Sequence, residues 1–299
     1  MTVILCYSSP LERRVALNAD FTIMQSLQSI LVRARRKSPT VVIHYHIFKN
    51  AGSSIDRLLH ESFGPCWTSF EGSHPTDIQS ADALRKFLAE RPGLCAVSSH
   101  LARPPLPSDN CVPIILLRDP IDRARSVFHF IRRDPTQPHH HATTNGFPAF
   151  VSWALDNPRA SVPIFDYQVY HLSDASFRPD NPELASTAQD LAQARALIAS
   201  LPAFGLVRRF AESCALLATH YTPLLPALRL YDVRENTSPE TARTEAQSLA
   251  AARDELGTDL FARLCNANQR DAGLYDFAGN QFARLTDGIH AMEPVRLMS

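Results

Sequence analysis

Glycine and long apolar runs are scarce in this chain. Only 10 of its 299 residues are glycine, which excludes a collagen-like sequence and makes each glycine position informative. No run of about 18 apolar residues occurs, so we expect no membrane-spanning helix. The formal net charge is zero, with 30 basic and 30 acidic residues. We therefore expect no general nucleic-acid partner, and any site for a polyanion must be a local patch.

The six cysteines form no C-x-x-C pair. Scattered cysteines of this kind are typical of reduced thiols in a cytosolic protein rather than of a disulfide framework. The short apolar start is followed by Glu12, Arg13 and Arg14, which is unlike a secretory leader. We therefore predict a cytoplasmic protein, and its hydrophobic content of 45% is enough for a packed core.

Strand-like and helix-like segments alternate through the first half of the chain. Residues 41–48 are rich in β-branched and aromatic side chains, which predicts a strand, and the continuous apolar run at 112–117 predicts a strand covered on both faces. We also predict a short buried strand at 94–99. Helical spacing at 55–63 and 124–131 follows the strands at 41–48 and 112–117. This alternation predicts an α/β fold with a mainly parallel central sheet flanked by helices.

The remaining segments predict further elements and a domain boundary. We expect residues 1–38 to form an N-terminal extension whose helix packs on a single domain at 39–299. We expect a polar loop at 134–148, helices at 22–37, 81–90, 183–200, 208–220, 239–256 and 270–284, and short strands at 204–207 and 229–233.

Polar residues follow each of the three predicted strands. The first strand leads into the loop from Lys49 to Ser54, the second ends at His100, and the third ends at Arg118, with Ser126 on the helix beyond. Ligands of parallel sheets bind beyond the carboxyl ends of the strands. If the three strands are neighbours, these groups face one cleft.

The loop after the first strand suits a phosphate or sulfate group. A loop that feeds a helix N-terminus exposes unpaired N–H groups. Gly52 would allow close approach of an anion, Ser53 and Ser54 would add hydroxyls, and Lys49 would add a full charge. The nucleoside-triphosphate motif G-x-x-x-x-G-K-[ST] is absent, because the lysine here precedes the glycine. The alternative is that Ser53 is a helix cap and Lys49 a surface lysine.

Arg118 and Ser126 form a second candidate anion site. An arginine at the end of a buried strand can bind a phosphate through two parallel N–H groups. Ser126 lies about two helical turns further on, on a face that could reach the same phosphate. The alternative is that Arg118 pairs with Asp119 or Asp122 and that Ser126 is an ordinary helical serine.

Two runs carry a resemblance to a known family. HIFKNAGSSI at 46–55 resembles the phosphosulfate loop of sulfotransferases that use 3′-phosphoadenosine 5′-phosphosulfate (PAPS), and PIILLRDPIDRARSVFHF at 113–130 resembles their 3′-phosphate segment. The branch is that of the Golgi-type heparan, chondroitin and dermatan O-sulfotransferases and their soluble bacterial relatives. Three further resembling segments follow in the family's order, VSSHLA at 97–102, FGLVRRFAESCALLA at 204–218 and CNANQRDAGLYDFAGNQF at 265–282.

The chain departs from the family pattern at three places, one of which is Arg209, where many relatives have a Glu-Arg pair shifted by one. Phe48 replaces the usual proline of the loop, and Ser99 replaces the usual glycine before the histidine.

The resemblance implies a P-loop-like three-layer fold and transfer of a sulfuryl group from PAPS, with the nucleotide 3′,5′-ADP (PAP) as product and no metal. Residues 49–54, namely Lys49, Asn50, Ala51, Gly52, Ser53 and Ser54, would hold the 5′-phosphosulfate, and Arg118 with Ser126 the 3′-phosphate. Lys49 would neutralise the leaving oxygen, and His100 would take the proton of an acceptor hydroxyl. A saccharide acceptor is favoured by the resemblance alone, while a lipid, a small metabolite or a peptide tyrosine stay open, as does the oligomeric state.

Several other residues have two interpretations. His46 abuts the loop, where it would brace the loop or contact the substrate, and His44 is expected in the core. Arg103 is either a contact for an acidic acceptor or a surface charge. The tract His139–His141 has no carboxylate or cysteine partner in sequence, which favours a solvated loop over a metal site.

Two other functions remain to be weighed against sulfuryl transfer. One is a P-loop-type kinase, and the other is a non-catalytic nucleotide-binding or scaffold protein with the same fold.

Overall fold

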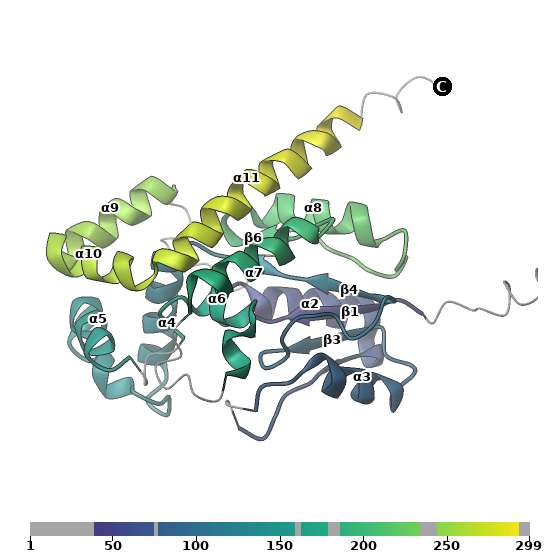
Figure 1. The fold of residues 1–299 in the computed structure, drawn as a ribbon, viewed down its shortest axis with the longest axis horizontal. Helices are drawn as coiled ribbons and strands as arrows, with labels where there is room; N and C mark the ends of the chain where they lie inside the picture. The colour runs from purple at the N-terminus through teal and green to yellow at the C-terminus, as the bar shows by residue number, and fades with distance from the viewer. Residues whose placement is uncertain (1–38, 75–76, 159–162, 179–185, 234–243, 293–299) are drawn as a thin grey trace, which may run out of the picture. The chain divides into compact units, whose positions relative to one another are not determined.

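The computed structural model describes residues 39–74, 77–158, 163–178, 186–233 and 244–292. From Thr40 onward the chain forms one compact unit (Figure 1). The predicted extension at 1–38, with its helix at 22–37, lies outside the described residues.

The central sheet has four parallel strands in the order β2-β3-β1-β4. These strands are β1 (Val41–Tyr45), β2 (Trp67–Ser69), β3 (Ala96–Ser99) and β4 (Cys111–Ile114). Every residue of β1 and β3 is buried, as expected for strands covered on both faces. The predicted α/β fold with a mainly parallel sheet is confirmed.

A second, two-stranded parallel sheet continues from the first. It pairs β5 (Leu116–Leu117) with β6 (Gly205–Leu206). Ile115 joins β4 to β5, and its carbonyl accepts a hydrogen bond from the Gly205 N–H at 2.8 Å. The strand therefore exchanges its partner β1 for β6 at this residue.

Helices flank the sheets, and several begin at side chains that accept hydrogen bonds from their first turn. Thr187 and Thr244 form capping boxes with the third helical residue. Asp119 caps the helix that begins at Pro120, a residue favoured at the first helical position. The helices are α2 (Gly52–Phe63), α3 (Ala81–Ala89), α4 (Pro120–Arg133), α5 (Gly146–Asp156), α6 (Tyr167–His171), α7 (Ala188–Ser200), α8 (Phe210–Tyr221), α9 (Glu245–Leu256), α10 (Thr258–Ala267) and α11 (Gln269–Met292).

The structure corrects several predicted elements. The first strand ends at Tyr45 rather than at residue 48, and the strand predicted at 112–117 is divided at Ile115. The segment predicted as a polar loop at 134–148 contains a 3₁₀ turn at His140–Thr143 and the start of α5.

The segment 229–233 is not a strand. Its polar groups bond to helix α2 instead, since the Arg229 N–H donates to Ser62 at 2.9 Å and the Tyr231 hydroxyl donates to Glu61 at 2.5 Å. The segment therefore has helix side chains for partners where a strand would have a neighbouring backbone.

The apolar residues form two clusters. The larger surrounds the sheets, and the smaller lies among α4, α5, α9 and α10. Within the described ranges, no helix combines the length and the apolar character needed to cross a membrane. The five described cysteines are free thiols, of which Cys111 and Cys214 are buried and Cys66, Cys95 and Cys265 are half-buried.

Candidate active site

The loop between β1 and α2 is held in an unusual backbone conformation. Lys49 and Ala51 have φ angles of 67° and 59°, in the left-handed region that non-glycine residues seldom occupy. The buried Asn50 side chain fixes this shape, because its Nδ2 donates to the Leu116 carbonyl and to Gln168 Oε1, both at 2.8 Å. The loop is therefore tied to β5 and α6 without any ligand.

The N-terminus of α2 presents free backbone donors. Ala51 occupies the N-cap position and supplies no side-chain cap, so the interpretation of Ser53 as the cap is wrong. Among the described residues, no partner accepts from the N–H groups of Gly52 and Ser53. Ser53 is exposed and Ser54 is buried. Unpaired N–H groups at a helix N-terminus favour an anion.

Position 52 requires a glycine for a reason that differs from the one expected from the sequence. A Cβ atom at this position would lie 1.9 Å from Nε2 of His46, far inside van der Waals contact. The space beside the glycine is thus filled by an imidazole ring, whereas the sequence suggested an approaching anion.

Lys49 lies against two aromatic rings. Its Nζ is 4.7 Å from the centroid of Phe130 and 5.8 Å from that of Phe48, and the two rings meet edge to face. Burial, together with the charges of Arg118 and Arg133, lowers the pKa of Lys49 to about 8. Lys49 pairs with no carboxylate within the described part of the chain, so its ammonium is available to a ligand.

Arg118 is joined directly to the Lys49 loop. Its Nη1 donates to the Lys49 carbonyl at 3.1 Å, and its backbone N–H donates to Gln168 Oε1 at 2.9 Å. The alternative pairing with a nearby aspartate is not observed. Asp119 accepts from the first N–H groups of α4, and Asp122 pairs with Arg208. The Arg118 guanidinium has no carboxylate partner among the residues described.

Ser126 lies on the stripe of α4 that faces this pair. Residues four apart share one helix face, so Ser126 lies between Asp122 and Phe130. The charge of Asp122 acts on Arg118, and the ring of Phe130 contacts Lys49. Ser126 itself is half-buried, and its hydroxyl has no hydrogen-bond partner among the described residues. Helix α4 therefore places the Ser126 hydroxyl on the side that faces Lys49 and Arg118.

His100 follows β3 and lies beside the end of β1. Tyr45 pairs with Ser99 in register, which places His46 level with His100. The two imidazole rings stack with centroids 3.8 Å apart. Glu71 accepts from the His100 backbone N–H at 2.9 Å and lies 2.9 Å from His100 Nδ1. The His100 side chain is 42% exposed, so the ring is accessible from solvent.

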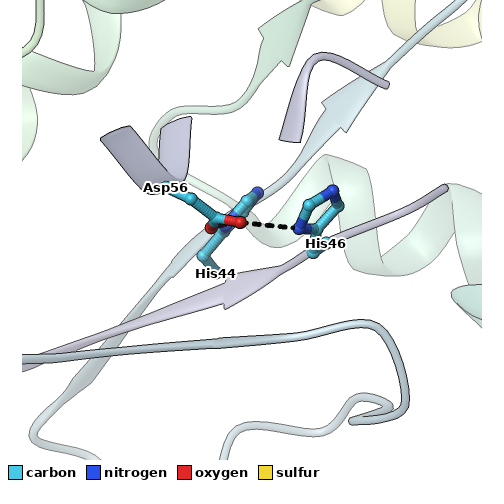
Figure 2. A group of neighbouring side chains, drawn as sticks. All are labelled: His44, His46 and Asp56. Atoms are coloured by element: carbon cyan, nitrogen blue, oxygen red, sulfur yellow. Dashed lines mark hydrogen bonds and ion pairs between the residues drawn. The ribbon is translucent and has the colours of Figure 1, made fainter. Parts of the chain in front are cut away.

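His46 belongs to a clamp formed with His44 and Asp56 (Figure 2). Asp56 Oδ1 lies 2.8 Å from His44 Nδ1, and Asp56 Oδ2 lies 3.0 Å from His46 Nδ1. Burial lowers the pKa of His46 to about 4, so the ring is neutral at pH 7 and its Nδ1 donates to the carboxylate. Burial raises the pKa of Asp56, but the hydrogen bonds from His44 and His46 outweigh it and hold that pKa far below the ordinary range.

Donor atoms of this clamp lie within 4.8 Å of one another. Two imidazoles and a carboxylate are a ligand set that zinc uses. In this structure they satisfy one another by hydrogen bonds, and His46 braces the loop through its contact with Gly52.

Arg103 lies beneath His100 and is only 1% exposed. Its Nη1 donates to the His100 carbonyl at 2.8 Å and to the Ala102 carbonyl at 3.0 Å. Because Arg103 is buried, it is neither a surface charge nor an exposed contact for an acceptor. It supports the backbone of His100 instead. The rings of His139 and His141 lie against Trp153, with centroids 5.1 and 5.9 Å away.

Sequence reasoning missed the residues that hold the predicted ones. Asp56 had a usable signal, since it stands four residues after Gly52 on a helix that packs beside the histidine-bearing strand. Glu71 and Gln168 had none, because their partners lie 29 and 50 or more residues away. Phe130 was visible only as an apolar residue of its helix.

Comparisons with known proteins add one relative. No family model matches the chain. It is 26% identical over 245 residues to an uncharacterized protein of Archaeoglobus fulgidus, an alignment that covers 79% of this chain and 94% of that protein. The argument for function therefore comes from the site.

Proposed function

We propose that this protein is a cytoplasmic PAPS-dependent sulfotransferase, a relative of the carbohydrate O-sulfotransferases, that transfers a sulfuryl group to an acceptor hydroxyl. One observation carries the proposal. The predicted groups form a continuous line of contacts, from Arg118 to the Lys49 carbonyl, along the loop to Gly52, and through His46 to His100. A donor with negative charge at both ends fits such a line.

The phosphosulfate end of PAPS would bind at the loop. The N–H groups of Gly52 and Ser53 and the Lys49 ammonium supply positive potential there without a bound cation. The 3′-phosphate would bind Arg118, whose guanidinium has no carboxylate partner in the described structure, and Ser126 beside it. Arginine suits this role because it binds phosphate through two parallel N–H groups.

In the transfer step the acceptor oxygen attacks the sulfur, and the bond from sulfur to the bridging phosphate oxygen breaks. The electron pair of that bond stays on the 5′-phosphate of PAP, where Lys49 stabilises the added charge. A positioned donor of this kind contributes about 3–4 kcal/mol. His100 takes the acceptor proton, which contributes roughly 10²–10⁴-fold in rate. The proton then passes to solvent.

The acceptor follows only from the resemblance, which favours a saccharide hydroxyl. No nucleic acid, metal or membrane anchor enters this mechanism.

A thermal-shift comparison of PAP with ATP plus Mg²⁺ tests the donor. A ligand that binds only the folded state raises the melting temperature, so PAP should stabilise the protein more than ATP. Preferential stabilisation by ATP with Mg²⁺ would favour a kinase, and no response to either would favour a scaffold.

Transfer from labelled PAPS to a panel of acceptors then tests the reaction. Lys49→Ala and His100→Ala should each lose at least about 10²-fold in kcat. Arg118→Ala should instead raise the KM for PAPS by about 10-fold or more, because a charged hydrogen bond contributes roughly 1.5–3 kcal/mol. Near-normal turnover in His100→Ala would place the base elsewhere.

A further inference from the structure

We infer that Glu71 is a positioning residue that holds His100 in the tautomer whose Nε2 is the base. This inference rests on the proposed sulfuryl transfer. Glu71 lies two residues beyond the end of β2. It contacts His100 at two points, since its carboxylate accepts from the backbone N–H at 2.9 and 3.2 Å and lies 2.9 Å from Nδ1. One side chain therefore fixes both the backbone and the ring.

The contact determines which nitrogen carries the proton. A carboxylate only accepts hydrogen bonds, so the Nδ1 that faces Glu71 must be the N–H nitrogen. Nε2 then holds the free electron pair. A neutral imidazole with its proton on Nδ1 accepts a hydroxyl proton at Nε2, and the resulting imidazolium faces the negative charge of Glu71.

The other side of the ring is held by a neutral group. His46 stacks on His100 at 3.8 Å with an interplanar angle of 29°. Asp56 and Gly52 fix the position of His46. Because His46 is uncharged at pH 7, the stack does not repel a positive His100. Glu71 is thus the carboxylate in direct contact with the His100 ring, while the buried Arg103 contacts only the carbonyl of His100.

Removal of the Glu71 carboxylate should leave the fold intact. Its side chain is 35% exposed, and its described hydrogen bonds go to His100 alone. Exposed substitutions away from buried contacts usually change stability by less than about 0.5 kcal/mol. A change in activity would therefore report on His100 rather than on unfolding.

The experiment compares the full-length wild type with Glu71→Asp, Glu71→Gln and Glu71→Ala. We expect kcat for transfer from labelled PAPS to fall by about 10–10²-fold in Glu71→Gln and Glu71→Ala, which is less than the roughly 10²–10⁴-fold that a general base contributes because His100 itself remains, while the KM for PAPS is unchanged. Glu71→Asp should recover part of the rate. Glu61→Gln removes a carboxylate of similar exposure at the far end of α2 and should change nothing.

A second readout does not depend on the reaction. Histidine labelled with ¹⁵N, assigned with His100→Gln, should show His100 with a protonated Nδ1 and a bare Nε2 in the wild type, and a mixture of tautomers in Glu71→Ala. An unchanged tautomer, or an unchanged kcat, would overturn the role of Glu71. Failure of the wild type to bind PAP would overturn the proposed function instead, and the ¹⁵N spectrum would still decide the contact.

Discussion

Replacing Gly52 with alanine should destabilise the site through a single contact. The new Cβ would lie 1.9 Å from His46 Nε2 and 2.0 Å from its Cδ2, whereas ordinary contact begins near 3.4 Å. The ring must therefore move by about 1.5 Å or the helix must shift. The ring has little freedom, since it stacks on His100 at 3.8 Å and its Nδ1 lies 3.0 Å from Asp56.

The magnitude follows from two costs. Overpacking a filled site costs about 1–3 kcal/mol, and the loss of a hydrogen bond to a charged group costs about 1.5–3 kcal/mol. We expect Gly52→Ala to lower the free energy of unfolding by about 2.5–6 kcal/mol. Urea unfolding followed by the fluorescence of the two tryptophans measures it.

A double-mutant cycle isolates the contact. In a His46→Ala background the Cβ has room, so Gly52→Ala should be neutral or slightly stabilising, and the coupling between the two positions should equal the loss in the wild type, about 2.5–6 kcal/mol. Gly279→Ala is the matched control, because no atom lies within 4 Å of its Cβ in the long helix α11. This control should gain up to about 1 kcal/mol. The reasoning fails if Gly52→Ala has the same small effect in both backgrounds.

Three further predictions concern the charges around the site. Affinity for PAP should be highest below pH 8 and should fall as the pH rises past 8, because Lys49, whose pKa is about 8, then loses its charge. Calorimetry measures this fall, and the Lys49→Met variant should not show it. Arg123→Met should lower the free energy of unfolding, measured with urea, by about 3–5 kcal/mol, because it leaves the fully buried Asp271, 3.9 Å away, without its counter-charge. A loss below about 1 kcal/mol would contradict this. Asp119→Ala should cost about 1 kcal/mol as a lost helix cap, whereas Asp119→Asn should keep the cap. Since burial raises the pKa of Asp119 to about 6, its ionisation costs the wild type stability as the pH rises from 4 to 7, and the Asn variant should gain relative to it over that interval.

The gross arrangement of the site was predictable from sequence, whereas its supports were not. Lys49, His100 and Arg118 follow three apolar runs, and parallel strands bring the ends of such runs together. The register of Tyr45 with Ser99 depends on sheet pairing, which no local pattern encodes. Strand β2 was missed because its three residues are only half-buried or exposed and show no alternation.

Gly52 shows how the sequence can suggest a different reason for a glycine from the one that the structure gives. A glycine in a loop before a helix suggested the close approach of an anion, and only the three-dimensional structure reveals that His46 occupies the space beside it. The prediction for Arg103 was wrong for a related reason. An arginine between a histidine and two prolines looked exposed, but the side chain is buried, and its Nη1 donates to two backbone carbonyls.

The left-handed backbone at Lys49 and Ala51 gives the loop a further property. Both residues hold a conformation that glycine would adopt more easily, and the surrounding hydrogen bonds keep them there. Under the proposed function, an anion would bind a loop that is already ordered, so binding would cost little conformational entropy. Selectivity for the size and shape of that anion would then depend on the backbone of the loop, and the side chains around it could vary more freely.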